Sequence, residues 1–595
     1  MAKTPRHRHH HHKTTMKPKS LSTRIENLLL ESQSDELGGP GIQVAVVDSR
    51  TGQLVYEGAV GLANPLDVDS QDNKLTTRHR ANLYSCSKFV TACSVLQLIG
   101  QHQLSKDDLI FDRLLLPHEL NDRILQPPDH PNNRRTREHV TIEHVVAHVS
   151  GAHNPLPLSW AHLMGEEPIM NELERLVSIF GGSGSGAKNK KNGGQNNPFR
   201  RGSVPQTFAY SNPGYMLLGP VILKAYNKEF PTDRLVETYH KHLQLPASIS
   251  DTFDIDSDND NDNDNDNDDK TEYTSSSDPM IMYGHVPRWS ILELVAKLAC
   301  PKGLIGIHYN SKWTRIEPHL IEGISYGGLI GCSHDMALWL GKLIGTDDII
   351  PLHEVREMMF TPIPASGGAM TFGMHIRKHK GLPVYHKEGG GPGCHSSIQL
   401  RPHTSGLVAC LISGDATLDV NTLLDDVVDE IENWQHDKRA DHIECSQKTV
   451  SSKDGTRIQV YHYQAKVPEK LKTECILDDC DNGTIMLIHG GPGVPDYLGE
   501  LALLLIDQGI TRSVVCFDQR GVGQSSRAAS TNMNNFLEDI EAIRGDLGLK
   551  KLHIVGHSWG GVLARFYAQS HPDRISSLLL LSPTTVQQGP DWPNM

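Results

Sequence analysis

Cysteine, long apolar runs and excess positive charge are what this chain of 595 residues lacks most clearly. Its ten cysteines form no CxxC pair, which is typical of free thiols in a reducing compartment rather than of a disulfide framework or a cysteine metal site. No run of about 18 apolar residues is present, and no apolar segment precedes a cleavage-like site, so the sequence predicts neither a membrane span nor a secretory signal. A formal net charge of −14 argues against general nucleic-acid binding. We therefore expect an intracellular, cytoplasmic protein.

The length predicts two domains, because single hydrophobic cores stop growing well below 595 residues. Residues 1–24 contain no acid and many Lys, Arg and His residues, and are predicted to be a disordered basic tail, with a mitochondrial presequence as the alternative. Residues 181–203 and 254–269 are too polar to offset their ordering entropy and are predicted to be disordered insertions. The second insertion alternates Asp and Asn but lacks the Gly and the terminal Glu of a calcium loop, so no metal is expected.

Hydrophobic periodicity outlines the two domains. Residues 41–48 and 52–58 read as two strands of a hairpin, and residues 421–434 as a helix that closes the first domain at residues 25–434. The polar residues 435–446 are predicted to be a linker. From there to residue 595, strand and helix patterns alternate, which predicts an α/β domain over residues 447–595.

A serine and a lysine near the front of the chain have the spacing of a catalytic pair. Ser85 and Lys88 lie three residues apart, so on a helix that begins at Ser85 both side chains share one face and can touch. A buried lysine with a lowered pKa can accept the proton of a serine hydroxyl, which is otherwise a poor nucleophile. Alone, such a pair also occurs by chance on surface helices, and the alternative for Tyr210 downstream is a core tyrosine with a satisfied hydroxyl.

Two further motifs follow in order. Tyr210-Ser-Asn212 gives Tyr-x-Asn, and Lys387-Glu388-Gly gives Lys-x-Gly. With Ser-x-x-Lys, they make the region from about residue 25 to 434 resemble the serine β-lactamase and penicillin-binding-protein superfamily, in its class C, esterase and D-peptidase branch. The resemblance implies an antiparallel sheet flanked by helices.

The same resemblance implies a role for each motif. Ser85 would be acylated, Lys88 would be its base, and Tyr210 a base or proton relay that Lys387 stabilises as a phenolate. Asn212 would orient the substrate amide. The backbone N–H groups of Ser85 and Gly390 would form an oxyanion hole, and glycines 389–391 would let the strand approach the substrate.

Two substitutions in the third motif leave alternatives open. His386 takes the role of Lys387 if the register slips by one residue. Glu388 replaces a small residue and is expected to repel the carboxylate of a β-lactam, which favours ester or amide substrates.

A second serine motif lies near the end of the chain. His489-Gly-Gly491-Pro-Gly, an Asp-Gln-Arg-Gly string and Gly-His-Ser558-Trp559-Gly resemble the α/β-hydrolases related to proline iminopeptidase. The resemblance implies that Ser558 stands on a nucleophile elbow and that the N–H groups of Gly491 and Trp559 form its oxyanion hole. In such enzymes an acid and then a histidine follow the serine, and here they do not. His571 and Asp573 come in the wrong order and before the next strand.

The sequence therefore predicts a β-lactamase/transpeptidase-like domain joined to an incomplete α/β-hydrolase fold, with Ser85 as the working nucleophile on a small ester, amide or peptide. No cofactor or metal is implied. One alternative is aminopeptidase activity at Ser558, completed by a longer chain or a partner. The other is a non-catalytic scaffold that self-associates, or whose incomplete sheet a partner covers.

Overall fold

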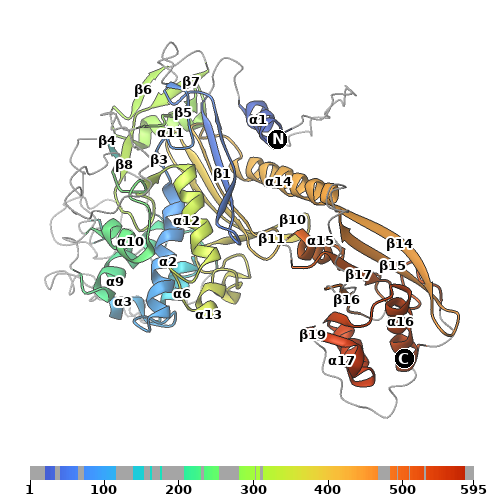
Figure 1. Cartoon of the computed structure of the whole chain (residues 1–595). Coiled ribbons are helices and arrows are strands. Elements are labelled where there is room, and N and C mark those ends of the chain that lie inside the picture. The colour runs from blue at the N-terminus through green and yellow to red at the C-terminus, as the bar shows by residue number, and fades with distance from the viewer. Residues whose placement is uncertain are drawn as a thin grey trace, which may run out of the picture. The chain divides into compact units, whose positions relative to one another are not determined.

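The computed structural model describes sixteen stretches of the chain (Figure 1). They are residues 20–33, 40–64, 73–114, 139–152, 154, 161–163, 175–176, 207–228, 234–252, 280–301, 303–308, 312–466, 483–491, 493–507, 510–527 and 531–582. The chain divides into two compact units, Met1–Ile431 and Glu432–Met595, and each is described by itself.

A six-stranded antiparallel sheet forms the centre of the first unit, in the order β10-β11-β12-β13-β1-β2. Its strands are β1 (Ile42–Asp48), β2 (Gln53–Val60), β10 (His375–His379), β11 (Leu382–Gly390), β12 (His395–Arg401) and β13 (Leu407–Ser413). β1 and β2 pair antiparallel, which confirms the predicted hairpin. All seven residues of β1 are buried, because β1 lies between β13 and β2 and is covered on both faces.

Helices cover the two faces of this sheet. The side chain of Val408 on β13 lies next to Gly341 of α12 (Ser333–Gly345). Val408 and its β12 partner Leu400 point to the same face of the sheet, so α12 packs on that face. Arg401, next to Leu400, points to the other face and binds α14 (Val420–His442) there. The antiparallel sheet between helices that the sequence predicts is therefore confirmed.

The remainder of this unit is mainly helical and is built around α2. Its helices are α1 (Leu21–Ser32), η2 (Tyr84–Cys86), α2 (Ser87–Gly100), α3 (Ile110–Arg113), α6 (Ile142–Val146), α8 (Asn212–Met216), α9 (Leu218–Ala225), α10 (Leu235–Leu243), α11 (Ile291–Ala299), α13 (His353–Glu357) and η4 (Pro364–Ser366). Three small sheets complete it, formed by β3 (Ala81–Asn82) with β9 (Ile330–Gly331), by β4 (Ala161–Leu163) with β8 (His319–Ile321), and by β5 (Gly284–Pro287), β7 (Trp313–Ile316) and β6 (Ile305–His308).

The sheet of the second unit has the order β14-β15-β17-β16-β18-β19. Its strands are β14 (Ile443–Ser451), β15 (Arg457–Ala465), β16 (Ile485–Ile488), β17 (Ser513–Phe517), β18 (Leu552–His557) and β19 (Ile575–Leu581), and its further helices are α15 (Gly499–Asp507), α16 (Met533–Asp546), α17 (Trp559–Ser570) and η6 (Pro572–Arg574). β16, β17, β18 and β19 are mutually parallel, which confirms the α/β pattern. In the described parts of both units, no helix has the length and apolarity needed to cross a membrane.

Two predicted segments, the tail and the linker, differ from the structure. The predicted tail already contains the start of α1, because Ser20 caps that helix by accepting a hydrogen bond from the N–H of Thr23 at 3.2 Å. The predicted linker at 435–446 is helical up to His442 and then enters β14. Most side chains of β14 are exposed, so its sequence carries no apolar alternation, although it pairs with β15 along its whole length. Both predicted insertions lie outside the described residues.

Candidate active site

The first serine stands at the entrance to the most buried helix of its unit. Ser85 occupies the single turn η2, and α2 follows with every side chain from Ser87 to Leu98 buried. Lys88 Nζ donates hydrogen bonds to Ser85 Oγ at 3.1 Å and to the carbonyl oxygen of Tyr326 at 2.5 Å. The contact that the three-residue spacing predicts is therefore present.

Two fully buried lysines lie at this site. Burial lowers the pKa of Lys88 well below its ordinary value, and the charge of Lys387 lowers it further. Burial also lowers the pKa of Lys387, to about 7. Among the described residues, the Nζ atom of Lys387 has no hydrogen-bond partner. A neutral amine beside Ser85 is thus favoured near neutral pH, and a neutral amine can accept a proton.

Tyr210 lies between the two lysines. The centre of its ring is 5.0 Å from Nζ of Lys88 and 5.0 Å from Nζ of Lys387. Burial raises the pKa of its hydroxyl, and a hydrogen bond with Ser85 offsets this only in part. The phenolate expected from the sequence is therefore disfavoured in this structure, because the hydroxyl is desolvated more strongly than its neighbours stabilise the anion.

Asn212 presents an unused acceptor at the same site. It is the first residue of α8, whose N-cap Ser211 accepts a hydrogen bond from the N–H of Gly214 at 2.9 Å. The backbone N–H of Asn212 donates to Oδ1 of Asn154 at 2.8 Å. Within the described parts of the chain, its own Oδ1 atom is buried without a partner. The backbone at Asn212 is thus held in place, and its side-chain oxygen is left for a substrate N–H.

Strand β11 packs against the turn that carries the nucleophile. A Cβ atom on Gly389 would collide with the carbonyl oxygen of Leu83, and one on Gly391 with the ring of Tyr84. Gly390 has no such clash and pairs with His395 of β12. The glycines were expected to make room for substrate, whereas two of them make room for the residues before Ser85. The oxyanion role of Gly390 stays a prediction.

The alternation of β11 decides between the two basic residues of the third motif. Lys387 is buried beside Tyr210, whereas His386 lies on the other face of the strand, where burial and then the charge of Arg377 lower its pKa to about 4. The predicted register is therefore the one that brings Lys387, and not His386, to Tyr210.

Glu388 points away from Lys387, with an exposed side chain that accepts a hydrogen bond from Nδ2 of Asn421 on α14. The predicted repulsion of a β-lactam carboxylate therefore loses its basis. The two neighbouring side chains occupy opposite faces of the strand, as in any β-strand.

His148 holds both neighbours of Tyr210, a role that the sequence interpretation did not assign to it. Its carbonyl oxygen accepts the N–H of Ala209 at 2.9 Å, and its Nδ1 accepts the N–H of Ser211 at 3.1 Å. Its ring centre lies 4.4 Å from that of Tyr210. Burial lowers the pKa of His148 well below its ordinary value, so the ring is neutral and can accept at Nδ1. No pattern in a single sequence reveals this role, because the two hydrogen bonds and the ring contact join His148 to residues more than 60 positions away.

The second serine stands on a sharp turn between β18 and α17. Ser558 has φ +52° and ψ −118°, a strained backbone for a residue with a side chain. A Cβ on Gly556 would lie 2.5 Å from the carbonyl oxygen of Gly560, and one on Gly560 would collide with the carbonyl oxygen of Ile488. The Gly-x-Ser-x-Gly spacing is therefore required by the tight turn, as a nucleophile elbow demands.

Among the described residues, this elbow has no base hydrogen-bonded to its serine. In the part of the chain that the structure describes, no side chain makes a hydrogen bond to the hydroxyl of Ser558. Gly491 has φ +70°, and Nε1 of Trp559 donates to Oε1 of Gln519 at 3.2 Å. His571 lies before β19, whose far end, Leu581, accepts the N–H of Ser558 at 2.9 Å. The histidine is thus at the opposite end of the strand from the elbow, as predicted.

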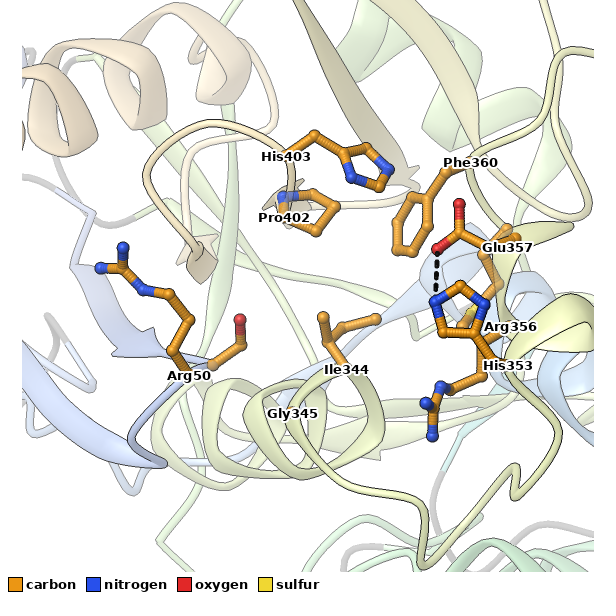
Figure 2. Close-up of a pocket in the computed structure, with 11 residues that line it drawn as sticks. Arg50, Ile344, Gly345, His353, Arg356, Glu357, Phe360, Pro402 and His403 are labelled. Carbon is orange, nitrogen blue, oxygen red and sulfur yellow. Dashed lines mark ion pairs between the residues drawn. The ribbon is translucent and has the colours of Figure 1, made fainter. Parts of the chain in front are cut away.

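A separate pocket of about 250 Å³ in the first unit does not involve Ser85 (Figure 2). His353 and Glu357 of α13 face each other across 3.8 Å at its edge, and Phe360 and His403 also line it. None of the residues that line this pocket belongs to the three motifs. It is therefore not the site at which Ser85 would act.

The antiparallel sheet with its paired lysines and the elbow on a parallel sheet define a chain with two serine hydrolase folds. The sequence model of the β-lactamase family matches residues 29–432, and the chain belongs to that family. The model of the α/β hydrolase fold matches residues 483–595.

Curated proteins are similar in sequence to a stretch of about 110 residues of the chain. Proline iminopeptidase from Heyndrickxia coagulans is 38% identical over 112 residues, which are 18% of this chain and 37% of that protein. The 1-acylglycerol-3-phosphate O-acyltransferase ABHD5 from Sus scrofa is 39% identical over 112 residues, 18% of this chain and 31% of that protein. The chain thus spans about a third of the length of these curated relatives.

Solved structures are similar to this chain at low identity. D-amino acid amidase from Ochrobactrum anthropi SV3, complexed with L-phenylalanine amide, has a TM-score of 0.46 at 15% identity and covers 70% of this chain and 100% of that chain. The octameric penicillin-binding protein homologue from Pyrococcus abyssi has a TM-score of 0.43 at 16% identity and covers 75% of this chain and 88% of that chain.

Proposed function

We propose that the first unit is a serine hydrolase that is acylated at Ser85 and cleaves a small ester, amide or peptide. The observation that carries the proposal is the hydrogen bond of 3.1 Å between Ser85 Oγ and Nζ of Lys88, a fully buried amine. A lysine in that position costs stability unless it is neutral, and a neutral amine is the base that a serine nucleophile needs.

The reaction would run in two halves. Ser85 Oγ attacks the carbonyl carbon of the substrate while Lys88 takes the hydroxyl proton, and the negative charge develops on the carbonyl oxygen. Collapse breaks the bond to the leaving group, which receives the proton from Lys88 or through the Tyr210 hydroxyl. Water then attacks the acyl carbonyl carbon and gives a proton to Lys88; the bond to Ser85 Oγ breaks as the acid is released, and Lys88 returns the proton to Ser85 Oγ.

Asn212 and Tyr210 narrow the range of substrates that fit the site. The free Oδ1 of Asn212 fits an amide N–H on the acyl part of the substrate. The protonated Tyr210 hydroxyl fits a leaving group that needs a proton, as an amine or alkoxide does. Because Glu388 faces α14, its carboxylate gives no ground for excluding substrates that carry a carboxylate.

The cellular location is part of the proposal. All eight cysteines in the described residues are free, and six of them are buried. Free thiols persist in a reducing compartment, which supports the cytoplasm.

A second candidate function is peptidase activity at Ser558, which the strained elbow favours. Its acid and histidine would have to come from residues that the structure does not describe or from another chain. Relatives named proline iminopeptidase make N-terminal residues of peptides the class of substrate to try.

Ester hydrolysis by two matched variants separates these functions. With p-nitrophenyl butyrate, Ser85→Ala is expected to lose at least about 10³-fold in kcat/KM, and Ser558→Ala less than about twofold. The reverse pattern would assign the activity to the second unit. Activity that neither substitution changes, or no activity in the wild-type chain, would favour the scaffold.

A further inference from the structure

Helix α11 carries its apolar side chains toward solvent. Ile291 is 80% exposed, Leu294 57% and Val295 50%, and Trp289 just before the helix is 84% exposed. An isolated exposed apolar side chain is ordinary on a protein surface, but four adjacent ones are not. α11 packs beside β5 of a small sheet in the first unit (Figure 1).

A buried carboxylate fixes this orientation. Glu293 is only 3% exposed and accepts hydrogen bonds from the N–H of Trp289 at 2.6 Å, from Nζ of Lys297 at 2.9 Å and from Oγ1 of Thr314 at 3.0 Å. Ser290 also caps the helix by accepting the N–H of Glu293 at 3.0 Å. Turning the apolar face inward would expose Glu293 and break these bonds, so the polar face is the one that holds α11 to the domain.

The sequence around α11 is basic, although the whole chain is acidic. Between residues 278 and 317 there are five Lys or Arg residues and three acids, of which Glu293 is buried and Glu317 pairs with Arg315, in a chain of net charge −14. Arg288 lies over the ring of Trp289 at 5.5 Å, and its N–H donates to the carbonyl oxygen of Lys312 at 2.7 Å. Lys312 is exposed. The guanidinium of Arg288 therefore lies beside the aromatic end of the apolar face, and the exposed Lys312 is its backbone neighbour.

We propose that this face, consisting of Trp289, Ile291, Leu294 and Val295 with Arg288 and Lys312 beside it, docks on an anionic lipid surface. A short helix with an apolar face, an adjacent tryptophan and neighbouring cations is the arrangement that lies in the interface of a bilayer. Cations next to such a face are attracted to acidic headgroups.

Two other occupants fit less well. A second copy of the chain would need about 800 Å² from each partner, and a helix of nine residues is only about 14 Å long. The Asp-rich residues 254–269 precede α11 in the sequence, but their carboxylates have no means of covering isoleucine and valine side chains.

Vesicle cosedimentation of the full chain tests the proposal. At low salt the wild-type chain is expected to bind phosphatidylcholine vesicles that contain 30% phosphatidylserine, and to bind pure phosphatidylcholine vesicles at least fivefold less. The double variant Ile291→Ser/Leu294→Ser is expected to lose at least fivefold of the bound fraction. The control Leu382→Ser, which removes another exposed leucine, is expected to bind as the wild type does.

A charge variant covers the case in which the double variant fails to fold. Lys312→Glu, at an exposed position outside α11, is expected to weaken binding to the acidic vesicles while ester hydrolysis and Tm stay unchanged. Absence of binding by the wild-type chain, or equal binding by all variants, overturns the proposal. So does a wild-type dimer in solution that Ile291→Ser/Leu294→Ser converts to monomer, because the face would then belong to a second copy.

Discussion

The two units differ in how many of the groups that a nucleophilic serine needs lie around Ser85 and around Ser558. Around Ser85 the chain supplies a buried amine within hydrogen-bond distance, a tyrosine and an asparagine with an unused oxygen. Around Ser558 it supplies only a strained turn between a strand and a helix, without a described base. The comparison teaches that backbone geometry can present a nucleophile, whereas its reactivity depends on a neighbour that takes its proton.

Removing the base should make the first site resemble the second. Lys88→Met keeps the length of the buried side chain and deletes the amine, so kcat for ester hydrolysis is expected to fall about 10²–10⁴-fold with little change in KM. Steady-state kinetics measure this. Unchanged kcat would show that Lys88 is not the base, provided that the Tm of the variant shows it folded.

Removing the His148 contacts that hold the neighbours of Tyr210 should have a smaller effect on kcat. We compare His148→Asn with His148→Gly, because both tolerate the φ of +58° at this position and only Asn keeps a side-chain acceptor for the N–H of Ser211. We expect about a tenfold loss of kcat in the Gly variant and a partial recovery in the Asn variant, as is typical when a hydrogen bond that positions a catalytic group is lost.

Denaturant unfolding separates that positioning role from stability. Equal losses of kcat in the two His148 variants, in proportion to their free energies of unfolding, would indicate a purely structural histidine.

A last expected effect is on stability and distinguishes Lys387 from an ordinary surface lysine. Its pKa is about 7 when folded and near 10.5 when unfolded, so the unfolded chain binds more protons between these values. The free energy of unfolding should therefore rise with pH from about 7 to 10.5, with this group adding at most about 1.4 kcal/mol per pH unit. Lys387→Met should flatten that slope, as urea unfolding across the pH range would reveal. A slope equal to that of the wild type would mean that Lys387 is solvated.

The sequence predicted most of what periodicity and spacing encode. The hairpin of β1 and β2 follows from β-branched residues around a turn, and the meeting of Ser85 with Lys88 follows from helical spacing. The elbow at Ser558 follows from Gly556 and Gly560, because the tight turn leaves no room for a Cβ atom at either position.

What failed depended on contacts that a single sequence does not show. Residues 443–446 at the start of β14 were interpreted as part of a linker, because pairing with β15, rather than burial, makes β14 a strand. Glu388 was placed toward the substrate, although the alternation of β11 turns it to α14. The protonated state of Tyr210 and the role of His148 also come from burial and from contacts between distant segments.

The most direct test of the central claim is to label the full chain with a fluorophosphonate, which reacts with activated serines, and to map the adduct by peptide mass spectrometry. Our account predicts an adduct on Ser85 that Lys88→Met abolishes, with none on Ser558. An adduct on Ser558 alone would contradict it, because the unit without a described base would then hold the working nucleophile.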